Sequence, residues 1–128
     1  MFARIALILA ALPLISAAPV PAVTRTLLEQ SDIPGTTLEH RLYRISYAPG
    51  ASAPAHDHPV AGLGYVLIGE FDSQFEGEAV THVRAGESFI DAANKPHILF
   101  RNPSADTPLV FLVSYAIPKG QAALRTLP

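Results

Sequence analysis

Cysteine is absent from the 128-residue chain, and charged side chains make up only 16% of it. The lack of cysteine excludes disulfides, thiolate metal sites and cysteine nucleophiles. Any metal must therefore be held by histidine, carboxylate or water. Nine basic and eleven acidic side chains give a formal net charge of −2. Such a chain has no broad positive field that would attract a phosphate backbone, so the composition gives no support to nucleic-acid binding.

Outside residues 1–18, the sequence has no sustained repeat of apolar residues at the 3.6-residue spacing of a helix. Twelve prolines and eight glycines are spread along the sequence, and they separate short apolar or alternating segments. This pattern predicts an all-β sandwich or barrel that forms one domain over residues 23–128. We expect an irregular arm or edge strand over 23–34, and strands within 37–48, 65–68, 71–75, 79–84, 88–90, 98–101 and 109–117.

Residues 1–18 have the features of a secretion signal. Arg4 gives a short positive region, and the following residues 5–15 are almost all Ile, Leu and Ala, interrupted by Pro13. This run is too short to cross a hydrocarbon layer of ~30 Å as a helix. We expect cleavage between residues 18 and 22, export to the periplasm or the medium, and no membrane attachment afterwards. An apolar N-terminal helix packed on the domain is the alternative.

Three histidines are the candidate metal ligands. His56 and His58 are separated by one residue, so they point to the same face if this segment is extended. His97 precedes another apolar segment and could meet the pair across a closed barrel. Three neutral imidazoles suit a divalent ion and leave coordination positions open for water or substrate. The alternative is a metal-free pocket in which the three rings bond to each other and to water, but burial of three unpartnered imidazoles is costly.

The spacing around these histidines resembles the two motifs of the cupin family. The similarity covers roughly residues 50–103 and implies a cupin double-stranded β-helix, which is a jelly-roll barrel. The flanking segments are similar to the outer strands of small single-domain cupins. The matching residues are Gly50, His56-Asp57-His58 and 65–69 for the first motif, and Gly86, Phe89, Pro96-His97 and Asn102-Pro103 for the second.

One departure from the family pattern concerns the metal site itself. Cupins commonly have a glutamate ligand after the His-x-His pair, and its position falls on Gly62 here. The resemblance then implies a three-histidine site on His56, His58 and His97, similar to that of cysteine and diketone dioxygenases, or a barrel that has lost its metal. A smaller departure is that the usual asparagine of the second motif comes one residue late, at Asn102, which indicates a β-bulge after His97.

Other chemistry-bearing residues are interpreted as structural. Asp57 should point to the opposite strand face, and His40 and His82 are expected near the surface. No general acid or base is assigned, and Tyr65 is left open between the pocket mouth and the core. Apolar side chains that we expect to fill the barrel are Leu67, Phe89, Leu99, Phe111 and Val113.

These observations predict an exported single-domain cupin that binds one divalent metal ion, of which Fe, Zn, Ni and Mn are the candidates. The metal site would act on or bind a small molecule, by dioxygenase-like or other metal-assisted chemistry. The alternative is a non-catalytic module that binds a metal or small ligand. The resemblance also allows pairing as a homodimer through the outer strands.

Overall fold

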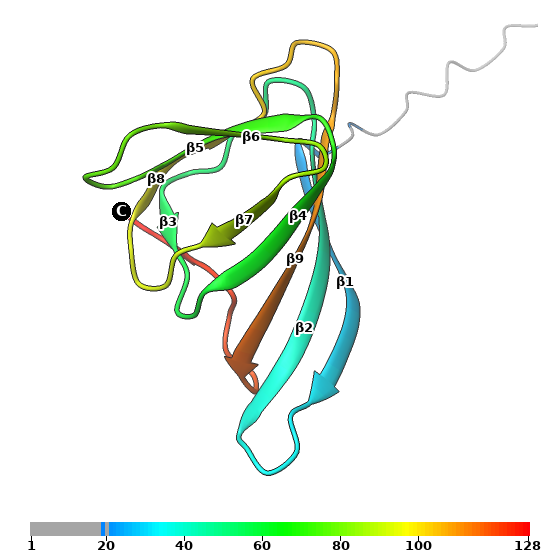
Figure 1. Cartoon of the computed structure of the whole chain (residues 1–128), viewed down its shortest axis with the longest axis vertical. Helices are drawn as coiled ribbons and strands as arrows, with labels where there is room; N and C mark the ends of the chain where they lie inside the picture. Colours follow the sequence, from blue (N-terminus) through cyan, green and yellow to red (C-terminus); the bar gives the residue numbers. More distant parts are fainter. Residues whose placement is uncertain (1–18, 20) are drawn as a thin grey trace, which may run out of the picture.

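The computed structural model describes residue 19 and residues 21–128, which fold into two antiparallel five-stranded sheets (Figure 1). The predicted signal segment lies outside the described residues. The first sheet has the order β1-β2-β9-β4-β7, and the second has the order β10-β3-β8-β5-β6. The expected all-β jelly-roll architecture is confirmed. No helix in the described part is long and apolar enough to span a membrane.

Eight of the ten strands in the described residues overlap the segments expected from the sequence, and the two-residue strands β3 and β10 were not among those segments. The bounds of the ten strands are β1 Val23–Asp32, β2 Leu38–Tyr47, β3 His56–Asp57, β4 Gly62–Ile68, β5 Glu70–Phe75, β6 Thr81–Arg84, β7 Ser88–Asp91, β8 His97–Arg101, β9 Leu109–Pro118 and β10 Arg125–Thr126. The arm at the N-terminus is a full edge strand, because β1 pairs with β2 along its length.

The core lies between the two sheets and is rich in aromatic rings. Phe71 from β5 and Phe100 from β8 meet Phe111 from β9, with ring centroids 4.5 to 6.2 Å apart. Val113 is fully buried beside them, as expected. Such pairs add to the stabilisation that comes from burying apolar area.

One expected core residue is wrong. Leu67 is 44% exposed, while its neighbour Val66 is fully buried. In a run of four apolar residues, alternation alone does not say which face is inward, and β4 also carries a register shift between Val66 and Ile68. Phe89 and Leu99 are half-buried, and Phe89 packs against the core.

Two details of the second motif behave as the sequence indicates. The pairing of β5 with β8 shifts register immediately after His97, which is the expected bulge. The displaced Asn102 is 1% exposed. Its amide donates to the carbonyl oxygens of Ala48 at 3.2 Å and Thr107 at 2.9 Å, and its side-chain oxygen accepts from the Ser104 N–H at 3.1 Å. Asn102 therefore ties two loops together at one end of the barrel.

Candidate metal centre

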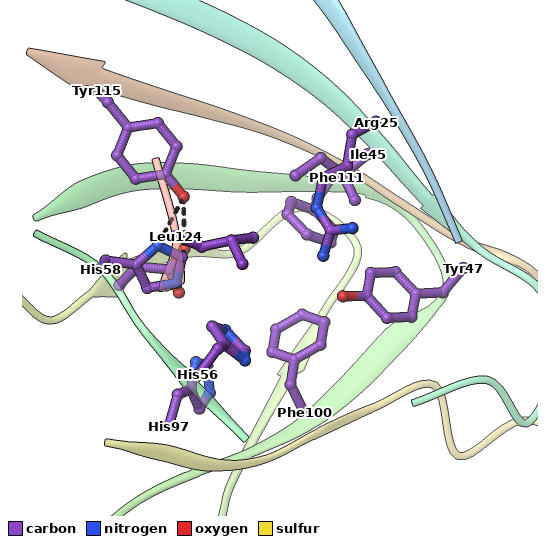
Figure 2. Close-up of a pocket in the computed structure, with 11 residues that line it drawn as sticks. Arg25, Ile45, Tyr47, His56, His58, His97, Phe100, Phe111, Tyr115 and Leu124 are labelled. Atoms are coloured by element: carbon purple, nitrogen blue, oxygen red, sulfur yellow. Dashed lines mark hydrogen bonds and ion pairs between the residues drawn. The ribbon is translucent and has the colours of Figure 1, made fainter. Parts of the chain in front are cut away.

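His56, His58 and His97 converge inside the barrel. His56 lies on β3 directly opposite His97 on β8, and His58 follows the end of β3. All three are buried, and each offers a ring nitrogen such that the three atoms lie within 4.8 Å of one another. The structure thus brings together the three residues that the sequence singles out. Figure 2 shows their rings around one end of a cavity.

Backbone carbonyls fix the tautomers of the first pair. The Nδ1–H of His56 donates to the Pro54 oxygen at 2.8 Å, and that of His58 donates to the Ala123 oxygen at 2.9 Å. Each Nε2 therefore carries a lone pair and no hydrogen. Histidines that bind metals usually have their second ring nitrogen held in this way.

His97 shows the clearest unsatisfied atom. Its Nε2 is 2.6 Å from the Ser73 hydroxyl, whereas its Nδ1 is buried and has no hydrogen-bond partner among the described residues. A buried imidazole nitrogen without a partner is costly unless it contacts an ion or water. The donor set of this cluster therefore fits a divalent ion.

Burial favours the neutral form of two of these rings, His97 and His56. It lowers the pKa of His97 to about 3, and the neighbouring His56 and His58 add to this effect. Burial also lowers the pKa of His56, although its bond to Pro54 partly opposes the change. Neutral imidazole is the form that binds a metal.

A carboxylate that the sequence analysis missed lies beside the cluster. Asp91, the last residue of β7, is buried, and its Oδ2 lies 3.6 Å from His58 Nε2. The Tyr115 hydroxyl donates to the same oxygen at 3.1 Å. Burial raises the pKa of the Asp91 carboxyl, and it also raises the pKa of Tyr115, with a further contribution from Asp91. The register of three strands, rather than any local motif, positions this pair.

The cavity next to the histidines has a volume of about 30 Å³, which is room for an ion with one or two waters. A second hollow of about 190 Å³ shares Arg25, Ile45, Tyr115 and Leu124 with it. Arg25 reaches in from β1, and Figure 2 shows its guanidinium pointing towards the cavity near Phe111. Arg25 forms no ion pair with any described residue.

The other singled-out residues lie elsewhere. Asp57 points away from the cluster and pairs with Arg125 at 2.8 Å. The exposed His82 pairs with the buried Asp72, and His40 is exposed. Tyr65 is neither at the pocket nor in the core, because it is 48% exposed on the outer face of β4.

The chain belongs to the cupin domain family, whose profile matches residues 43–115. No curated protein matches it. Among solved structures, it is similar to a cupin-like protein from Thermotoga maritima, with a TM-score of 0.64, 21% identity, and coverage of 82% of this chain and 75% of that one. This likeness agrees with the two-sheet fold described above.

Two enzymes are also similar in structure. An oxalate oxidase in complex with the substrate analogue glycolate gives a TM-score of 0.64 and 26% identity over 84% of this chain. The DMSP lyase DddQ from Ruegeria pomeroyi gives 0.65 and 20% identity over 82% of it. The present chain spans only 56% of the oxidase and 51% of the lyase.

Proposed function

We propose that this protein is an exported, divalent-metal-dependent cupin that acts on a small organic anion. The observation that carries the proposal is the convergence of three buried imidazoles on one point, with a guanidinium across the cavity from them. His56, His58 and His97 would hold the ion. When bound, the ion would supply Lewis-acid chemistry, polarising a substrate oxygen or activating water or dioxygen.

The anionic charge of the ligand follows from the charges that surround the cavity. A divalent ion and the Arg25 guanidinium are both positive, and Asp91 is the single acidic residue that lines the cavity among the described residues. Guanidinium groups bind carboxylates through paired N–H donors. A small carboxylate between the ion and Arg25 would be attracted from both sides. The likeness to an oxalate oxidase that binds glycolate supports this class of ligand.

The size of the cavity favours a second candidate, a non-catalytic metal-binding module. About 30 Å³ beside the histidines is far below the roughly 300 Å³ of common ligand pockets. A substrate would therefore have to extend into the neighbouring hollow, between Tyr43 and the segment 122–124. A module that only holds an ion would not need this extra room.

Metal content is the first test of the proposal. Protein purified from the exported fraction, without added metal or chelator, should contain close to one equivalent of a transition metal by elemental analysis. The variant His97→Gln should lose it. A metal-free wild type that also fails to bind Mn²⁺, Ni²⁺ or Co²⁺ would refute the proposed function.

Calorimetric titration then tests the choice of ligand. Metal-loaded protein should bind glycolate or oxalate at least tenfold more tightly than the neutral analogue ethylene glycol. Arg25→Gln should remove this preference, whereas Arg44→Gln should keep it, because Arg44 is exposed beside the inward Ile45 on β2. Equal binding of the anions and the diol would reject an anionic ligand. Turnover of the bound anion, followed by oxygen consumption and product NMR, separates the enzyme from the binding module.

A further inference from the structure

Position 62 carries no carboxylate, but the neighbouring strand β7 carries one, Asp91, directly opposite. Gly62 on β4 is the direct register partner of Asp91 on β7 and of Tyr115 on β9. These three residues form a row across the sheet and face the same side. We propose that Asp91 is a fourth metal ligand, so that the centre consists of three histidines and one aspartate. This inference rests on the proposed metal-dependent function.

Gly62 is what allows this arrangement. A Cβ at position 62 would lie 2.5 Å from Cε1 of Tyr115 and 3.0 Å from Cγ2 of Val113. The tyrosine ring therefore occupies the space that a side chain at position 62 would need. Across that space, its hydroxyl reaches Asp91 Oδ2 at 3.1 Å. Because position 62 on β4 has no side chain, the Tyr115 ring fits against it and its hydroxyl can bond to the Asp91 carboxylate on β7.

The distance between Asp91 and His58 suits a shared ion. Two ligands that each lie about 2.1 Å from one metal are roughly 3.0–3.5 Å apart, depending on the coordination geometry. Asp91 Oδ2 and His58 Nε2 are 3.6 Å apart, close to this range. The carboxylate lies outside the set of atoms within 4.8 Å of one another, which the three histidines alone supply, so it would have to move towards His56 and His97 to share their ion. A longer separation would leave Asp91 only an indirect role through a histidine.

The hydrogen bonds of His58 exclude a simple neutral contact with Asp91. His58 Nδ1–H donates to the Ala123 oxygen, so Nε2 is an acceptor. The facing Asp91 oxygen, which already accepts from Tyr115, is an acceptor too. Two acceptors that face each other in a buried site require a cation between them or an added proton. A divalent ion would satisfy both atoms.

Metal selectivity provides the first test. Carboxylate ligands favour Mn²⁺, whereas imidazoles alone bind Ni²⁺ well. In competition titrations with a chromogenic chelator, Asp91→Asn should weaken Mn²⁺ binding by tenfold or more and weaken Ni²⁺ binding less. The Co²⁺ absorption spectrum should also change, because one protein ligand is replaced. Glu39→Gln is the matched control, since Glu39 is a buried acid that pairs with Arg41 and does not line the cavity.

Chemical rescue separates a ligand from a positioning group. In Asp91→Ala, added formate should fill the vacated coordination position, restoring Mn²⁺ affinity and the wild-type Co²⁺ spectrum, whereas formamide should not. If the Asp91 carboxylate had only a structural role, formate would not restore Mn²⁺ affinity or the Co²⁺ spectrum. Unchanged Mn²⁺ affinity and an unchanged Co²⁺ spectrum in Asp91→Asn would overturn the assignment, while the three-histidine site and the proposed function would stand.

A measurement on the wild type covers the case in which both variants fail to fold. Addition of Zn²⁺ to the metal-free protein should shift carboxylate stretching bands in the infrared difference spectrum, because Asp91 is the one acid that lines the cavity in the described part of the chain. Zinc binding without any carboxylate shift would overturn the assignment. Failure of the wild type to bind any metal would instead refute the proposed function, and this inference with it.

Discussion

Acidification of the metal-free protein should destabilise it through His97. In the folded state, burial lowers the pKa of His97 to about 3, whereas an unfolded histidine titrates near 6.5. The unfolded chain therefore binds the proton first, and stability falls as the pH drops below about 6.5. Between pH 7.5 and pH 5 the unfolded imidazole titrates through about 1.5 pH units, which corresponds to about 2 kcal/mol at 1.36 kcal/mol per unit.

Urea unfolding of chelator-treated protein, followed by circular dichroism at pH 7.5, 6 and 5, measures this loss. The lowered pKa of His56 adds a loss of the same sign, whereas the raised pKa of Asp91 contributes the opposite sign. Comparison with His97→Gln isolates the His97 contribution, because that variant should lose about 2 kcal/mol less over the same pH range. His40→Gln, at an exposed position, should behave as the wild type. Equal losses in the wild type and His97→Gln would refute the reasoning.

Three further outcomes are expected. Gly62→Ala should lower the free energy of unfolding in urea by about 1–3 kcal/mol, because the added Cβ displaces the Tyr115 ring. Tyr115→Ala in the same chain should relieve part of that loss, and strictly additive losses in the double variant would contradict this contact. Asn102→Ala should cost about 2–4 kcal/mol in the same assay, since it leaves buried backbone groups of two loops without partners, and a loss below about 0.5 kcal/mol would contradict that role. Intact mass of the exported protein should correspond to a chain that starts between residues 19 and 23, and a full-length mass would reject the signal segment.

Local patterns predicted most of the strands and the common face of His56 and His58, because each depends on neighbouring residues. His97 was added through the resemblance to the cupin motifs, since its contact with His56 depends on the pairing of β3 with β8. Alternation sets the common face of His56 and His58, and Gly and Pro mark where strands end. Even the bulge after His97 was visible as a one-residue delay of Asn102. Strand ends, alternation and the bulge need no knowledge of which strands pair.

Features that depend on strand register could not be predicted from local patterns alone. Asp91 was not singled out, because nothing nearby in the sequence marks it as buried or as a neighbour of His58. Its position becomes meaningful only when β4 pairs with β7 on one side and β9 on the other. Leu67 failed for a related reason, since a continuous apolar run does not reveal which face is inward.

Some residues beside the metal site lie outside the part of the chain that matches the cupin family, and this bears on which ligand the site would select. The three histidines, Asp91 and Tyr115 all lie within residues 43–115, which match the cupin domain family. Arg25 and the segment 122–124, which line the adjoining hollow, lie outside that range. The ligand would therefore contact residues outside the family match as well as Tyr43, Ile45 and Tyr115 within it. His58 Nδ1 connects the segment 122–124 to the metal centre, because its hydrogen bond to Ala123 fixes the tautomer that exposes Nε2. A change in the segment 122–124 that moved the Ala123 carbonyl would thus alter the orientation of His58 at the metal centre as well as the shape of the adjoining hollow.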